Sequence, residues 1–84
     1  LSSKAKLFSV KAASFKVVNN ANNLRDKLRD AGYEAFISSK KNKEGVIIHR
    51  VAVGPLLDKQ DAEQMRLSID NEFSLEAQIM ELTL

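Results

Sequence analysis

The chain has 84 residues, of which 44% are hydrophobic and 29% are charged, as is ordinary for one small folded domain. It contains no Cys, which excludes disulfides and thiolate metal sites, and its formal net charge of +2 is too small to indicate nucleic-acid binding by itself. No apolar run approaches the ~20 residues of a membrane-spanning helix. We therefore expect one domain, residues 1–84, that does not insert into a membrane and that has been excised from a longer protein.

The first predicted element is a strand over residues 6–12, where apolar and polar residues alternate. Its core-facing positions are Phe8, Val10 and Ala12. We expect residues 13–16 to form a connection in which Phe15 returns to the core.

A helix is predicted over residues 20–31, because apolar residues recur there at helical spacing. This stripe consists of Ala21, Leu24, Leu28 and Ala31. Asn19 or Asn20 is the expected N-cap, and Gly32 is the expected stop because glycine readily adopts positive φ.

Two strands follow, at residues 34–39 and 46–55, joined by the basic loop at residues 40–45. Residues 46–55 form the longest β-branched run in the chain, and Gly54-Pro55 is expected to end it in a sharp turn. We expect the core side of these two strands to carry Ala35, Ile37, Ile47, His49, Val51 and Val53. The opposite side of the longer strand carries Ile48, Arg50 and Ala52.

A second helix is predicted over residues 59–71, with Asp58 as its N-cap. A last strand is predicted over residues 75–82. The core-facing residues of these elements, with Phe73 one helical turn further, are Ala62, Met65, Ile69, Phe73, Ala77 and Ile79.

The element order β-α-β-β-α-β predicts an α+β, two-layer, ferredoxin-like (RNA-recognition-like) sandwich. Its four-stranded antiparallel sheet would be covered by two helices on one face and open on the other. By alternation, the open face carries Ser9, Lys11, Phe36, Ser38, Ile48, Arg50, Gln78 and Met80. This mixture suits an elongated polar ligand with apolar faces and anionic groups, such as a sugar chain or a single nucleic-acid strand, although a merely solvated sheet face remains open.

Several motifs occur in an order that resembles the SPOR (sporulation-related repeat) domain family. They are Val10-Lys11-Ala12-Ala13-Ser14-Phe15, Asn20-Ala21 with Leu24 and Leu28, Gly32-Tyr33 with Ala35, His49-Arg50-Val51-Ala52-Val53-Gly54-Pro55, and Ala62. Lys11 and Ala13 stand where the family often has Gln and Gly. The resemblance covers nearly the whole chain, and the motif that ends in Gly-Pro is its most specific part.

This resemblance implies a non-catalytic module that binds bacterial peptidoglycan from which the stem peptides have been removed ("denuded" glycan). It implies a periplasmic location at the division septum, within an envelope protein anchored to the inner or outer membrane, and a monomer without cofactor. Arg50 would grip a muramic acid carboxylate with two parallel N–H bonds, and Lys11 would add a second charge. Phe36 would stack on a sugar ring, with apolar contacts from Ile48 and Met80. The side chains that would form hydrogen bonds with sugar hydroxyls are those of Ser9, Ser38 and Gln78.

Other functions remain as alternatives. We expect that the chain is not an enzyme, because its only His, His49, is interpreted as a packing residue and no catalytic-triad spacing is present. We expect no metal site, because the sequence lacks the spacing of metal ligands. Single-stranded RNA binding shares the fold, but the first and third strands lack stacking aromatics on the open face. Protein docking would use the edge strand Glu34–Ser39, or Leu82 and Leu84 paired with a second copy.

Overall fold

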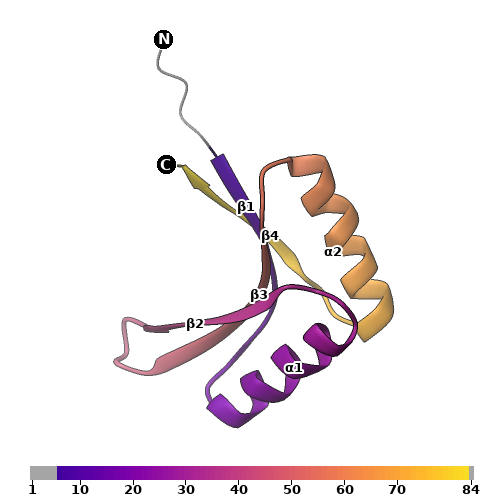
Figure 1. The fold of residues 1–84 in the computed structure, drawn as a ribbon. Helices are drawn as coiled ribbons and strands as arrows, with labels where there is room; N and C mark the ends of the chain where they lie inside the picture. The colour runs from indigo at the N-terminus through magenta and orange to yellow at the C-terminus, as the bar shows by residue number, and fades with distance from the viewer. Residues whose placement is uncertain (1–5, 84) are drawn as a thin grey trace.

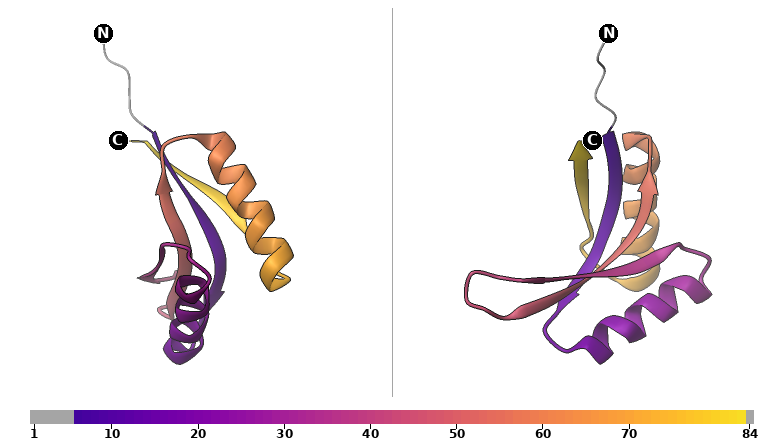
Figure 2. Two further views of the ribbon diagram at one scale, coloured as in Figure 1. Left: turned by 45° about the vertical axis from the view of Figure 1, so that its right-hand side comes forward. Right: turned by 60° about the vertical axis from the view of Figure 1, so that its left-hand side comes forward.

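The computed structural model describes residues 6–83 and confirms the predicted element order (Figure 1). The elements are β1 (Lys6–Phe15), α1 (Val18–Asp30), β2 (Ala35–Lys41), β3 (Ile47–Leu56), α2 (Lys59–Phe73) and β4 (Gln78–Thr83). The strands form one antiparallel sheet in the order β2-β3-β1-β4, so that β3 and β1 are central and β2 and β4 are the edges. Both helices lie on one side of the sheet (Figures 1 and 2). Neither helix is long and apolar enough to cross a membrane within the described part of the chain.

The core lies between the helices and the sheet face they cover, as the apolar periodicities predict. Leu28 of α1 and Ile69 of α2 are fully buried, and they meet three fully buried valines of the central strands. The buried residues of this core are Phe8, Val10, Ala12, Ala21, Leu28, Ala35, Val51, Val53, Ala62, Ile69 and Ala77. No polar side chain is buried among residues 6–82, so the interior between the helices and the sheet is apolar.

Helix α1 begins earlier than predicted, so the expectation that Asn19 or Asn20 caps it is wrong. The N-cap is Val17, which makes no side-chain cap bond, and both asparagines lie inside the first turns. The Val17 carbonyl accepts the backbone N–H groups of Asn20 (3.1 Å) and Ala21 (3.4 Å), and this starts the helix before the asparagines.

The C-terminal end of α1 confirms Gly32 as the stop. Gly32 has φ +96°. Its N–H donates to the backbone carbonyl oxygen of Arg29 at 3.0 Å, and the Tyr33 N–H donates to the carbonyl oxygen of Leu28 at 3.0 Å. These two bonds form a Schellman motif, which requires the left-handed backbone that glycine adopts at little cost. Ala31 is the exposed C-cap and not a member of the buried stripe, so its predicted core position is wrong.

Strand β1 continues to Phe15, three residues beyond the predicted end. Its register against β3 shifts between Lys11 and Ala13. At this point β1 contains one more residue than the segment of β3 with which it pairs. This bulge changes the alternation along β1. Phe15 therefore packs against the core as predicted, whereas Ser14 pairs with Arg50.

Strand β3 runs through Gly54-Pro55 to Leu56, so the predicted turn at this dipeptide is wrong. Gly54 has φ +143°, and a Cβ there would lie 3.2 Å from the Phe8 carbonyl oxygen. The glycine thus allows a close approach of β1 and β3 where their register is irregular.

The β2–β3 hairpin projects beyond the region that the helices cover (Figures 1 and 2). Ile47, expected in the core, is consequently 49% exposed, and that expectation is wrong. Asn42 shapes the loop, because its Oδ1 accepts the backbone N–H groups of Glu44 (2.9 Å) and Val46 (3.0 Å). Strand β2 ends at Lys41, two residues later than predicted.

Helix α2 begins as predicted, with the Asp58 Oδ1 accepting the Gln60 N–H at 2.8 Å. It ends at Phe73, followed by Ser74 with φ 54°. Asp70 accepts the Ala77 N–H at 2.7 Å and pairs with Arg66. The bond to Asp70 attaches the residues before β4 to helix α2. Strand β4 begins at Gln78, so the predicted start at residue 75 is wrong.

Candidate ligand-binding face

The open face of the sheet brings together all eight residues predicted for it. The register forms rows across the strands: Phe36 pairs with Ala52, Ala52 with Lys11, and Lys11 with Gln78. The neighbouring rows are Ser38–Arg50–Ser14 and Ser9–Met80, and Lys40 pairs with Ile48. Directly paired residues of an antiparallel sheet point to the same side, so these side chains share one surface.

Arg50 lies along this surface, across its centre. Its Nη1 donates to the Met80 Sδ at 3.8 Å, although Met80 belongs to β4, two strands away. In a flat sheet the Cα atoms of Arg50 and Met80 would be roughly 16 Å apart, because they are separated by two strand spacings across the sheet and by about four residues along the strands. Both side chains must therefore extend over the face toward each other. Ala52, on the same face, is only 2% exposed.

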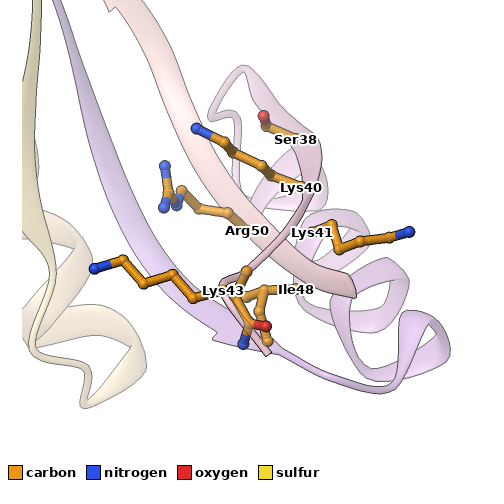
Figure 3. Close-up of a pocket in the computed structure, with 7 residues that line it drawn as sticks. Ser38, Lys40, Lys41, Lys43, Ile48 and Arg50 are labelled. Atoms are coloured by element: carbon orange, nitrogen blue, oxygen red, sulfur yellow. The ribbon is translucent and has the colours of Figure 1, made fainter. Parts of the chain in front are cut away.

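Arg50 separates two shallow hollows. The first, here called the hairpin hollow, has a volume of about 350 Å³ and is shown in Figure 3. Its lining is Ser38, Lys40, Lys41, Asn42, Lys43, Ile48 and Arg50. The second, here called the apolar hollow, has a volume of about 260 Å³. Its lining is Ser9, Phe36, Ser38, Arg50, Ala52, Met80, Glu81 and Leu82.

Both hollows include Ser38 and Arg50 in their linings, so they adjoin each other at these two residues. Six of the eight predicted residues line one or both hollows. Lys11 and Gln78 line neither hollow and lie in the Phe36–Ala52 row.

The positive charge of this face is not neutralised internally. Within residues 6–83, the ion pairs involve Lys6, Arg25 and Arg66, and none involves Arg50 or the hairpin lysines. In Figure 3 the charged ends of Lys40, Lys43 and Arg50 extend to one side of the hairpin, whereas Lys41 points away from them. The cations Arg50, Lys40 and Lys43 therefore lie on one side of the hairpin without an acidic partner among the described residues (Figure 3).

Sequence reasoning missed part of this face. Lys40 and Lys43, interpreted there as a solvated hairpin tip, line the hairpin hollow. Lys40 has the same parity as Phe36 and Ser38, so a longer predicted β2 would have found it. Ser14 was missed because the bulge in β1 leaves no recognisable sequence signal.

The structure contains one Ser–His contact, on the helix-facing side of the sheet. The Ser39 Oγ lies 2.7 Å from the His49 Nδ1, and the two residues are a cross-strand pair. No acidic partner of His49 occurs among the hydrogen bonds of residues 6–83, so this is not a triad. His49 is on the predicted side of β3 but is only half-buried. In the described part of the chain, no three His, Cys, Asp or Glu side chains are placed to hold a metal ion.

The family follows from comparison with known proteins. The model of the SPOR domain matches residues 4–79, and the chain belongs to the SPOR domain family. The α+β fold and the resemblance of the sequence motifs to this family are thereby confirmed. No curated protein matches the chain.

Three solved structures are similar to this chain. The peptidoglycan-binding domain of the B. subtilis cell wall lytic enzyme CwlC is 21% identical over 98% of this chain and 96% of that one, with a TM-score of 0.73. The RlpA SPOR domain from Pseudomonas aeruginosa is 23% identical over 87% and 96%, with a TM-score of 0.76. The SPOR protein DedD is 27% identical over 93% of this chain and 40% of its own, with a TM-score of 0.66.

Proposed function

We propose that this SPOR domain is a non-catalytic module that binds denuded peptidoglycan glycan strands on the open face of its sheet. The observation that carries the proposal is Arg50. Its guanidinium lies across the centre of the face, between two hollows and without an acidic partner among the described residues. A planar guanidinium binds a carboxylate through two parallel N–H bonds, and a denuded strand presents a free lactyl carboxylate on each muramic acid.

The surroundings of Arg50 supply the remaining chemistry of such a ligand. Phe36 is 38% exposed and offers a flat apolar surface to a sugar ring. Ile48 and Met80 add apolar contact. The polar groups placed for sugar hydroxyls are Ser9, Ser38 and Gln78, and Lys11 adds a second cation beside Ala52.

Family membership supports this ligand class. CwlC carries a domain of similar fold that is described as peptidoglycan-binding. The RlpA SPOR domain and the SPOR protein DedD are likewise similar in structure to this chain. We further propose that the chain, as a monomeric module of a membrane-anchored envelope protein, directs that protein to the septum in the periplasm.

Single-stranded RNA binding is the competing function for this fold. Its stacking aromatics would stand on the two central strands. Neither central strand has an aromatic residue at these open-face positions: Ser9, Lys11 and Ser14 on β1, and Ile48, Arg50 and Ala52 on β3. With Phe36 alone on the edge strand β2, the face favours a sugar chain over stacked bases.

A paired binding assay separates these functions. The purified domain is mixed with sacculi, either untreated or treated with amidase, and in parallel with single-stranded oligonucleotides. We expect retention by sacculi that increases strongly after amidase treatment, and no retention of oligonucleotides. Binding to oligonucleotides without binding to treated sacculi would overturn the proposal.

A further inference from the structure

We propose that the hairpin hollow is a second anion subsite, so that this domain prefers glycan strands in which two successive muramic acids carry free carboxylates. The inference rests on the proposed function and adds a ligand-length requirement to it. It assigns a binding role to Lys40 and Lys43, which lie outside the set of residues predicted from the sequence.

Three cations, Lys40, Arg50 and Lys11, lie on a diagonal of the sheet. Lys40 pairs with Ile48, Arg50 lies two residues further along β3, and Lys11 pairs with Ala52, again two residues further. Each step crosses one strand and advances two residues, so successive Cα atoms are roughly 8 Å apart. Separate charges in a line suit a ligand whose anionic groups are spaced along a chain, and not one compact anion.

Two lysine side chains of the hairpin, Lys40 and Lys43, are directed toward the side on which Arg50 lies (Figure 3). Asn42 accepts two backbone N–H groups of the loop and so holds the turn that carries Lys43. A loop that is ordered before binding reduces the entropic cost of binding.

The apolar hollow lacks the lysines of the hairpin hollow. It contains no cation besides Arg50, and much of its lining is apolar, from Phe36, Ala52, Met80 and Leu82. A second ligand carboxylate is therefore disfavoured there and favoured beside Lys40 and Lys43. The ligand's charged groups would lie on the hairpin side of Arg50, with an uncharged ring face against Phe36.

The test is calorimetric titration of the whole domain with peptide-free glycan fragments that carry one or two lactyl carboxylates. We expect the wild type to bind the two-carboxylate fragment at least about tenfold more tightly, corresponding to ~1.4 kcal/mol. The double variant Lys40→Gln/Lys43→Gln is expected to bind the one-carboxylate fragment like the wild type and to lose most of this gain. Its fold should be unaffected, because both side chains are exposed.

Lys27→Gln/Lys59→Gln is the matched control, since it removes the same two charges from exposed positions on α1 and α2, on the helix-covered side of the sheet. It should retain the gain. Equal wild-type affinity for both fragments, or an equal loss in Lys27→Gln/Lys59→Gln, would overturn the second subsite and leave the proposed function intact. Failure of the wild type to bind either fragment would overturn both.

Discussion

The two faces of this sheet are made by the same four strands but have opposite character. The helix-covered face is apolar and closely packed, and its Val10, Val51 and Val53 are fully buried, as are Leu28 and Ile69 of the helices that cover it. The open face carries hydroxyls, an amide, cations and only a few apolar groups. Because side chains alternate along a strand, each strand contributes to both faces at once. Stability and ligand binding should therefore be separable, residue by residue.

The largest expected effect is on stability, from Leu28→Ala. Leu28 is 0% exposed on α1, and its truncation should lower the unfolding free energy by about 2–5 kcal/mol because it leaves a cavity. Urea denaturation measures this loss. The control Leu67→Ala, at a leucine 52% exposed on α2, should change stability by less than about 0.5 kcal/mol. A loss of glycan affinity in the folded fraction of Leu28→Ala would show that the two faces are not separable.

A smaller effect is expected at Asp70, which attaches the start of β4 to α2. Asp70→Ala leaves the Ala77 N–H without its partner and should cost about 1–3 kcal/mol. Asp70→Asn keeps an acceptor oxygen and should recover most of this loss. Hydrogen exchange at the Ala77 amide reports the bond directly, and unchanged protection in Asp70→Ala would contradict its role.

On the open face, Phe36→Ala should reduce affinity for denuded glycan with little change in stability. The loss of a flat ring contact corresponds to about 0.5–1.5 kcal/mol, or roughly a 2- to 10-fold weaker affinity. Phe36→Leu retains apolar contact without the ring face and should restore little of it. If Phe36→Leu binds like the wild type, Phe36 contributes hydrophobic area and not stacking.

The smallest expected effect is the pH dependence contributed by Tyr33, which lies away from the open face. Burial, and then the hydrogen bond from its hydroxyl to Glu72 (2.9 Å), raise the pKa of Tyr33 above its ordinary value of 10.0. A raised pKa in the folded state means that this contribution to stability is present below pH 10 and is lost as pH rises through the folded-state pKa. Tyr33→Phe should keep the edge contact with Phe73 and lack this alkaline loss.

Since Tyr33 is the only tyrosine and there is no Trp, ultraviolet titration reports this ionisation alone. The folded wild type should ionise at higher pH than the urea-unfolded chain. An ionisation at the same pH in both would contradict the raised pKa. Glycan affinity at neutral pH should be the same in wild type and Tyr33→Phe, because the two faces are separate.

The sequence predicts much of the distribution of side chains between the helix-covered face and the open face, because alternation in strands and helical spacing directly reflect which side chains are buried. The core positions of Val51, Val53 and Leu28 follow from these patterns, as does the placement of Arg50 on the open face. The cap at Asp58 and the stop at Gly32 have local chemical causes that are visible in the sequence.

The errors occur where tertiary structure decides. Ile47 has a core-like pattern, but the hairpin extends beyond the helices and leaves it exposed. The bulge that brings Ser14 beside Arg50 depends on the pairing of β1 with β3, and so does the continuation of β3 through Gly54-Pro55. Lys40 and Lys43 looked like an ordinary polar loop, and only the direction of their side chains relates them to Arg50.

The most direct test of the account is to measure the stability and the glycan affinity of Arg50→Ala side by side, with Arg50→Lys as the control that keeps the charge but lacks the two-pronged guanidinium. We expect Arg50→Ala to unfold within about 1 kcal/mol of the wild type, because it lies on the open face, and to bind denuded glycan at least about tenfold more weakly. Arg50→Lys should recover only part of the affinity. Unchanged affinity in Arg50→Ala would remove Arg50 from the site and contradict the proposed use of this face.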